Sequence, residues 1–347
     1  MHPKWTALSW QHAIVQAPMA GSQGNALALA VCQAGGMGSL PGAMLSHEAL
    51  SAELKILREQ ARGPWNVNFF CHTPPPPDEA AQARWRDTLH AFFEEAGIDP
   101  SSIPASPGRV PFSHAVADVV EPFAPPVVSF HFGLPAPDLL ARVKGWGSLV
   151  MSSATTVDEA RWLQSHGADA IIAQGLEAGG HRGLFLNNDL STQLGTFALL
   201  PQVLAAVDVP VVAAGGIADA AGVRAALALG ASAVQVGTAY LCCHEASTSP
   251  VHRAALLSPE SHHTELTTLF SGRPARGIVN RLMRTLGPRH PAAPAFPTAT
   301  AAVAPLRAQF EAQGQGDCSP LWAGQNTRGC RAVSAAEVTQ ALALGLA

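Results

Sequence analysis

The residues best suited to chemistry lie in one glycine-rich stretch, residues 174–183, with the sequence Gln-Gly-Leu-Glu-Ala-Gly-Gly-His-Arg-Gly. It follows an apolar run, residues 170–173, that is typical of a buried strand. Its glycines allow positive φ angles and a close approach of the backbone to a ligand. With His181 and Arg182 at its end, the stretch predicts a site for an anionic ligand. The alternative is a plain turn with a surface histidine.

The elements that would position this stretch alternate between strands and helices. Continuous apolar strands separated by helices indicate a parallel sheet that is buried on both faces. Eight such units are complete by about residue 240, and no dinucleotide-binding glycine pattern follows the first strand. This favours a (β/α)8 TIM barrel, an α/β fold, over an open sheet. The expected strands cover residues 14–17, 36–40, 65–70, 126–131, 148–152, 170–173, 210–214 and 233–236.

The size and composition of the chain are compatible with a large core and an additional subdomain. The chain has 347 residues, of which 48% are hydrophobic and 13% charged. We expect a cofactor-binding barrel over residues 1–245. Residues 246–347 are expected to form a helical, Pro-rich subdomain that packs on the barrel, since no strand alternation is visible there. A helix is also expected over residues 78–96, followed by an irregular segment over residues 97–110.

Charge and cysteine usage exclude several classes of function. The net charge is −4 and no run of Lys or Arg occurs, which argues against a nucleic-acid partner. The six cysteines form no Cys-x-x-Cys pair, as expected for reduced thiols in a cytoplasmic protein. The most apolar window, residues 196–217, is interrupted by proline and aspartate, so no membrane span is expected. The histidines lack partners at metal-ligand spacing, so we expect no metal site. The sequence does not indicate an oligomeric state.

Glycines and amide side chains follow the expected strands at the end where barrels bind ligands. Residues 215–216 and 237–238 suit phosphate binding through backbone N–H groups, or the glycines serve only to permit tight turns. No lysine stands at a strand end to form a Schiff base, and no carboxylate pair is present, which argues against an aldolase or isomerase. The amides of Asn68, Gln174 and Gln235 suit the polar edge of a flat heterocycle, which favours a flavin.

These residues also match a known family. The sequence resembles the nitronate monooxygenases, FMN-dependent barrels, over nearly the whole chain. The most specific matches are residues 180–183 (Gly-His-Arg-Gly) and 129–133 (Ser-Phe-His-Phe-Gly), and residues 16–21, 67–70 and 321–325 also fit. The resemblance implies that His181 is catalytic and that His131 lines the same pocket. It implies that FMN is bound by Pro18, Met19, Asn68, Gln174, Gly179, Gly180, Gly215, Gly216, Gln235, Val236, Gly237 and Thr238.

The activity that this resemblance implies is the oxidation of alkyl nitronates, such as propionate-3-nitronate, by dioxygen. The products are a carbonyl compound and nitrite, and the role would be detoxification. The alternatives are a related FMN-dependent reductase that uses NAD(P)H on an enoyl thioester or quinone, and a flavin-binding protein without turnover. Members often carry tyrosines in the C-terminal part, where this chain has Phe296, and its single tyrosine is Tyr240. If such a tyrosine shapes the substrate pocket, the preferred nitronate differs here.

Several residues retain two interpretations from sequence alone. His181 is a general base, or a hydrogen-bonding group that orients the nitronate, or a structural histidine bonded to backbone. His131 lines the substrate pocket or only packs. Arg182 is an anion partner in the substrate pocket or part of a surface salt bridge. Arg273 and Arg276 bring a guanidinium to the ligand, or they tie the C-terminal region to the barrel.

Overall fold

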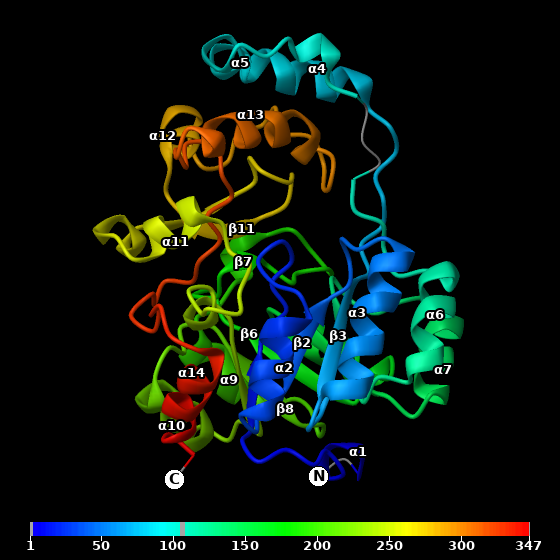
Figure 1. The fold of residues 1–347 in the computed structure, drawn as a ribbon. Helices are drawn as coiled ribbons and strands as arrows, with labels where there is room; N and C mark the ends of the chain where they lie inside the picture. Colours follow the sequence, from blue (N-terminus) through cyan, green and yellow to red (C-terminus); the bar gives the residue numbers. More distant parts are fainter. Residues whose placement is uncertain (1–2, 105–107, 347) are drawn as a thin grey trace.

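The computed structural model describes residues 3–104 and 108–346, and within them eight parallel strands form the expected barrel (Figure 1). The strand order is β1-β9-β8-β6-β5-β4-β3-β2. The ring closes between β1 and the residue before β2, where Gln16 N donates to Met37 O at 2.9 Å. Every expected strand is confirmed to within two residues. The strands are β1 (Ile14–Gln16), β2 (Gly38–Pro41), β3 (Trp65–Phe70), β4 (Val127–His131), β5 (Leu149–Ala154), β6 (Ala170–Gln174), β8 (Val211–Ala214) and β9 (Ala233–Val236).

Both faces of the barrel strands are buried, which explains their continuous apolar sequences. The inner faces pack on one another around Met151, Ile172 and Val212, and Trp5 of α1 (Pro3–Thr6) joins this cluster. The outer faces pack against helices whose caps are local, such as Ser46, whose side chain accepts from Ala49 N. These helices are α2 (Asn25–Gln33), α3 (His47–Gln60), α6 (His114–Val120), α7 (Pro137–Gly145), α8 (Val157–Ser165), α9 (Thr196–Leu204), α10 (Ala220–Ala228) and α14 (Ala335–Ala343).

A second layer, which we call the cover, lies over the carboxyl ends of the strands, with α1 at the opposite end (Figure 1). Its helices are α4 (Glu79–Thr88), α5 (His90–Ala96), α11 (Pro250–Leu256), α12 (Arg281–Leu286) and α13 (Thr300–Ala312). The helix expected over residues 78–96 is therefore two helices. They leave the barrel after β3 and pack with α12 and α13 around Trp85, Phe93 and Phe310. The division at residue 245 stays a prediction, but residues 79–96 share a core with the later segment.

The C-terminal segment also contains strands, which corrects the expectation of a helical extension without them. β10 (Thr264–Thr267) pairs antiparallel with β11 (Ala275–Ile278). β11 also pairs with β7 (Gly180–His181), which lies in the glycine-rich stretch. A short pattern of this kind has too few residues to show alternation in the sequence. The cover is thus joined to the barrel by a sheet that includes His181.

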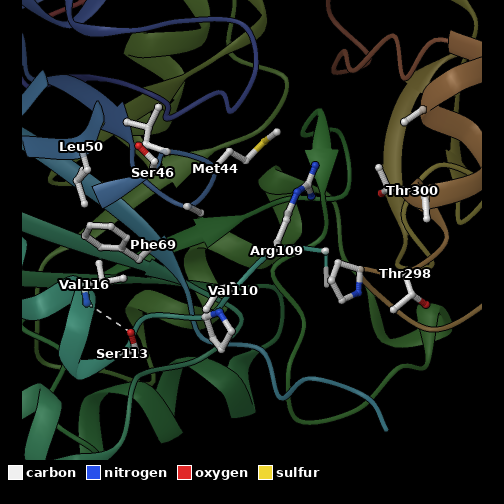
Figure 2. A pocket seen from close by; sticks show the side chains of 18 of the residues that line it. Met44, Ser46, Leu50, Phe69, Arg109, Val110, Ser113, Val116, Thr298 and Thr300 are labelled. Carbon is white, nitrogen blue, oxygen red and sulfur yellow. Dashed lines mark hydrogen bonds between the residues drawn. The ribbon is translucent and has the colours of Figure 1, made fainter. Parts of the chain in front are cut away.

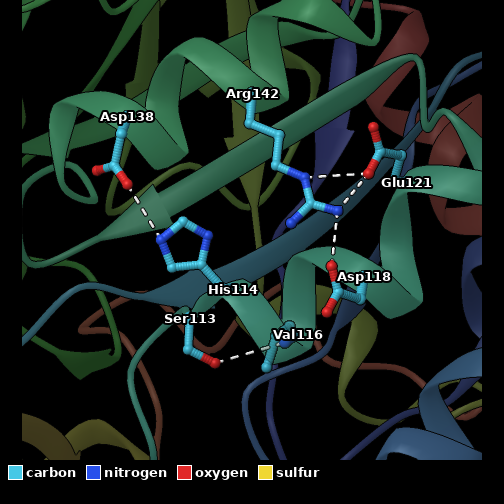
Figure 3. A network of polar contacts seen from close by, with 7 residues as sticks. All are labelled: Ser113, His114, Val116, Asp118, Glu121, Asp138 and Arg142. Carbon is cyan, nitrogen blue, oxygen red and sulfur yellow. Dashed lines mark hydrogen bonds and ion pairs between the residues drawn. The ribbon is translucent and has the colours of Figure 1, made fainter.

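The chain returns from the cover to the barrel through α6, which ion pairs hold against its neighbours (Figure 3). Arg142 of α7 pairs with Asp118 of α6 at 2.7 Å and also with Glu121. His114 Nε2 lies 3.0 Å from an Asp138 carboxylate oxygen. Part of the irregular segment expected before α6, residues 105–107, lies outside the described residues.

No helix in the described ranges is both long enough and apolar enough to cross a membrane.

Candidate functional site

A cavity lies at the carboxyl ends of the barrel strands, below the cover. It gathers residues from strand ends all around the barrel, as expected for this fold. The sequence did not single out Phe70, Arg109, Trp322 or Asn326, which also line it. Nearly all predicted site residues meet here: Pro18, Met19, Asn68, His131, Gln174, Gly179, Gly180, His181, Gly215, Gly216, Gln235, Gly237 and Thr238. Val236 does not, because its side chain points into the outer core.

One corner of the cavity exposes backbone rather than side chains. Gly215 and Gly216 have φ angles of +116° and +72°, which favour glycine. A Cβ atom on Gly215 would lie 2.8 Å from Thr196 Oγ1. Thr238 Oγ1 accepts a hydrogen bond from Gly324 N at 2.9 Å, so its own proton is available to a ligand. We call Gly215, Gly216, Gly237 and Thr238 the glycine corner.

Two glutamines that line the cavity have different roles. Gln174 Nε2 donates to His181 O at 3.0 Å, and Gln174 Oε1 accepts from Gly183 N at 2.8 Å. Both ends of this amide therefore hold the glycine-rich stretch in place. Gln235 Oε1 is buried and has no hydrogen-bond partner in the described structure. Because an unsatisfied buried acceptor is costly, Gln235 suits a ligand that supplies an N–H or O–H donor.

The cover fixes the glycine-rich stretch from above. His181 is paired in register with Ala275 of β11. Arg276 Nε donates to Leu176 O at 3.0 Å, from the neighbouring position on β11. Arg276 therefore ties the cover to the barrel, which is the second of the two interpretations that its sequence allowed.

Arg182 does not line the cavity, which corrects its assignment to the substrate pocket. Arg182 directly follows β7, and its N donates to Pro274 O at 2.9 Å. Successive side chains along extended backbone point to opposite faces, so Arg182 points away when His181 faces the cavity. Its side chain is fully buried and donates to the carbonyl oxygens of Gln174 and Gly175, each at 2.7 Å, and to Gln193 Oε1 at 3.0 Å. Arg182 is therefore a buried structural residue. It neither lines the substrate pocket nor forms a surface salt bridge, the two alternatives that the sequence left open.

His131 positions the backbone of His181. Its Nε2 lies 3.1 Å from His181 O, and since a carbonyl only accepts, Nε2 carries the proton. Its Nδ1 is then the acceptor for Ser153 Oγ at 3.1 Å. Burial lowers the pKa of His131 to about 3, so the ring is neutral at neutral pH.

His181 is the histidine at the centre of the cavity. Its Nε2 lies 2.8 Å from Ser271 Oγ, and its ring centroid lies 5.4 Å from that of Phe296 and 5.5 Å from that of Trp322. Burial, and next the positive charge of Arg109, hold its pKa well below the usual range. A neutral imidazole of this kind offers one donor and one acceptor and is a weak base.

Arginine and aromatic side chains surround His181. The Arg109 guanidinium carbon lies 5.7 Å from the ring centroids of Phe70 and Phe296. That of Arg273 lies 4.0 Å from the centroid of Phe132, and Arg273 also donates to the Leu184 carbonyl. Phe132 holds a φ of +71°, which is rare for an aromatic residue and aims its ring at this cluster. We call Arg109, Arg273, Phe70, Phe132 and Phe296, with His181, the arginine side.

The cavity carries positive charge without a compensating acid. Its described lining contains no aspartate, glutamate or lysine. Glu177, the acidic residue of the glycine-rich stretch, instead accepts from Thr196 N at 2.8 Å and caps α9. Within residues 3–104 and 108–346, no group of three or more His, Cys, Asp or Glu residues could hold a metal ion. The arrangement suits a flat ligand with phosphate at the glycine corner and a second, anionic ligand beside His181.

Comparisons with known proteins cover the whole chain. The model of the nitronate monooxygenase family matches residues 2–345. A nitronate monooxygenase of Paraburkholderia phytofirmans is 41% identical over 336 residues, which cover 95% of this chain and 90% of that protein. The solved nitroalkane oxidase of Streptomyces ansochromogenes has a TM-score of 0.89 and 39% identity, covering 99% of this chain and 97% of that one. A FabK variant of Thermotoga maritima has a TM-score of 0.70 and 26% identity, with coverages of 97% and 92%.

Proposed function

The chain belongs to the nitronate monooxygenase family, and from this premise we propose that it is an FMN-dependent enzyme that oxidises alkyl nitronates with dioxygen. The products are a carbonyl compound and nitrite. The observation that carries this proposal is the charge of the cavity, in which Arg109 lies beside a neutral His181 and no carboxylate occurs among the described lining residues. A nitronate is an anion, and such a cavity stabilises it while repelling no part of it.

The residues of the cavity fit FMN. The glycine corner offers backbone N–H groups and the Thr238 hydroxyl to a phosphate, with no acidic side chain in the lining. The unpaired Gln235 Oε1 suits an N–H donor on the edge of a heterocycle. Pro18, Met19 and Gly180 line the same cavity. FMN, when bound, supplies the electron acceptor for the nitronate and the route of electrons to dioxygen.

The residues of the arginine side act on the substrate. The Arg109 guanidinium balances the negative charge of the nitronate, and neutral His181 supplies a hydrogen bond that orients it. Because the lowered pKa makes His181 a weak base, the nitronate rather than the neutral nitroalkane is the form that this site takes. His131 and Gln174 both hold the His181 backbone in place through its carbonyl oxygen. Phe70, Phe132 and Phe296 are at most 7% exposed and exclude water from the reacting carbon.

The direct experiment is to purify the protein, load it with FMN and measure nitrite release from propionate-3-nitronate and ethyl nitronate in air. We expect a yellow protein that releases nitrite without NAD(P)H. A protein that cannot be loaded with FMN would contradict the cofactor assignment. A loaded protein that releases no nitrite but rapidly oxidises NADH or NADPH would favour the alternative, a reductase of enoyl thioesters or quinones.

We also propose that the enzyme works in the cytoplasm and detoxifies nitronates. The cysteines are free thiols, which fits a reducing compartment. Deleting the gene should lower the concentration of propionate-3-nitronate that stops growth. Unchanged tolerance would contradict the role in detoxification.

A further inference from the structure

A second cavity lies beside the site, between the barrel and the cover (Figure 2). Its volume is about 870 Å³, within the roughly 300–1,000 Å³ typical of ligand pockets. Its walls come from residues 42–47 after β2, from residues 108–116 and from residues 297–305 of the cover. Arg109 and Ala43 line both cavities, so the two meet at these residues. We call the second one the rim cavity.

The rim cavity is mainly apolar. Leu50, Phe69 and Val116 line its barrel side, and Met44 and Val110 line it as well. Met44 is 54% exposed and Val110 is 60% exposed, so the apolar surface continues from the cavity to solvent. No aspartate, glutamate or lysine occurs in its described lining. Apolar surface of this kind, open to water, is typical of a binding site for an apolar group.

Arg109 is the charged residue where the two cavities meet. Figure 2 shows its side chain between Phe69 on the barrel side and Thr298 on the cover side. Its Nη1 atom is buried and has no hydrogen-bond partner in the described structure. Its backbone is fixed, because His72 Nε2 donates to Arg109 O at 3.0 Å. Burial lowers the pKa of Arg109 to about 10, so the guanidinium stays charged at neutral pH.

Arg109 is half-buried, and its buried, unpaired Nη1 is destabilising unless a ligand supplies an acceptor. No ion pair to Arg109 is present among the described carboxylates. The anion would have apolar surface on one side, in the rim cavity, and His181 on the other. This combination selects a ligand with an anionic head and an apolar chain.

We propose that the preferred substrate is a nitronate with a linear apolar chain of several carbons, whose head contacts Arg109 and His181 and whose chain occupies the rim cavity. The inference rests on the proposed function and specifies its substrate class. Arg109 binds the anion, and the rim cavity selects the length of the chain. The Phe296 ring lies beside Arg109, with its centroid 5.7 Å from the guanidinium carbon, and adds apolar surface next to the anion site.

Chain length is the measurable variable. Burying one methylene improves binding by up to about fourfold. With the FMN-loaded full chain, kcat/KM for nitrite release should therefore rise through ethyl, butyl, hexyl and octyl nitronate. Alkanoates are anions that cannot be oxidised in this way, and octanoate should bind more tightly than acetate in a calorimetric titration. A flat series together with equal binding of the two alkanoates would overturn the inference.

Variants connect this effect to the rim cavity. Ala304 lines the cavity from α13, and Ala304→Trp should reduce the rise with chain length and the preference for octanoate. Ala308→Trp is the matched control, because Ala308 is also exposed on α13 but does not line the cavity. Equal behaviour of these two variants would overturn the placement of the chain.

Arg109→Gln should weaken binding of acetate and octanoate by the same factor and keep the preference for octanoate. Arg109→Lys should restore part of the loss, because it restores the charge. If Arg109→Gln binds both alkanoates as the wild type does, Arg109 is not the anion site. Failure of the proposed function can be distinguished from failure of this inference, because in the first case no nitronate of any chain length would release nitrite.

Discussion

The glycine corner and the arginine side meet at the same cavity, which Phe70, Arg109 and His181 of the arginine side line directly, but the two are built in different ways. The glycine corner consists of two neighbouring strand ends, after β8 and β9, and works through backbone conformation. The arginine side collects Phe70, Arg109, His181, Arg273 and Phe296 from separate segments of the barrel and the cover. A site made of backbone N–H groups can bind a phosphate whatever side chains surround it. A site assembled from distant side chains can change its ligand without altering that backbone site.

The largest effect is expected on the arginine side. His181→Ala removes a hydrogen-bonding group at the substrate, so kcat/KM for nitronates should fall by roughly 10²–10³-fold while FMN is retained. An equal fall on nitronate and neutral nitroalkane would indicate orientation of the substrate. A fall confined to the neutral nitroalkane would indicate proton abstraction. The control is His166→Ala, since His166 stacks on Trp162 outside the site. Activity within threefold of the wild type would remove His181 from the mechanism.

A substitution in the glycine corner should instead affect FMN binding. Gly215→Ala places a side chain at a φ of +116° and close to Thr196 Oγ1. Strain of roughly 1–3 kcal/mol should weaken FMN binding by about 10- to 100-fold, as measured by equilibrium dialysis. Gly145→Ala is the control, because a Cβ on Gly145 meets nothing within 4 Å. If Gly215→Ala retains FMN as tightly as the wild type, the phosphate does not bind at the glycine corner.

Buried histidines near the arginine side and in the cover make folding stability depend on pH. Burial lowers the pKa of His72, beside Arg109, to about 4, and that of His252, in the cover, also to about 4. The unfolded chain, with a histidine pKa near 6.5, binds these protons more readily. The free energy of unfolding should therefore be highest above about pH 6.5. It should fall as the pH is lowered from 6.5 to 4, by up to about 1.4 kcal/mol per pH unit for each histidine.

Urea unfolding at a series of pH values measures this dependence. His252→Gln preserves a donor for the Trp322 carbonyl, which His252 Nε2 contacts at 3.0 Å, and should reduce the slope between pH 6.5 and 4. A slope for His252→Gln equal to that of the wild type would show that His252 is not held neutral in the folded protein.

The smallest effect concerns the support of His181. Ser271→Ala removes the hydroxyl that lies 2.8 Å from His181 Nε2. One such hydrogen bond contributes about 0.5–1.5 kcal/mol, so kcat/KM should fall by roughly two- to tenfold with FMN binding unchanged. The control is Ser261→Ala, because Ser261 is buried in the cover and contacts Thr327 instead. A larger fall, equal to that of His181→Ala, would make Ser271 a direct substrate ligand.

The same contrast explains how much the sequence predicts. The barrel strands and the glycines at residues 215–216 are local features, since apolar runs and positive φ angles leave direct marks in the sequence. Arg109 leaves none, because its role depends on Phe296, almost two hundred residues away, and its neighbours in the chain are Pro- and Ser-rich. Arg182 was misassigned to the substrate pocket because a sequence does not show to which side the residue after a short strand such as β7 points.

The cover shows the same limit on a larger scale. β10 and β11 have only four residues each, and β7, which pairs with β11, has two. Strands this short show no periodic pattern in the sequence. Residues 79–96 have a helical pattern in the sequence. Whether these helices lie against the barrel or in the cover is decided by their packing on α13, which the pattern does not show. A sequence signal for the arginine side does exist in residues 129–133, where Phe132 follows His131. The resemblance to the family identified that segment, but it did not predict that the Phe132 ring contacts Arg273.

The most direct test is to mix the FMN-loaded protein with ethyl nitronate in the absence of dioxygen and follow the absorbance of the oxidised flavin. We expect this absorbance to be lost on mixing without any NAD(P)H, and nitrite to appear when air is admitted. Flavin that stays oxidised with the nitronate and is bleached only by NADH or NADPH would contradict the proposed function and favour the reductase.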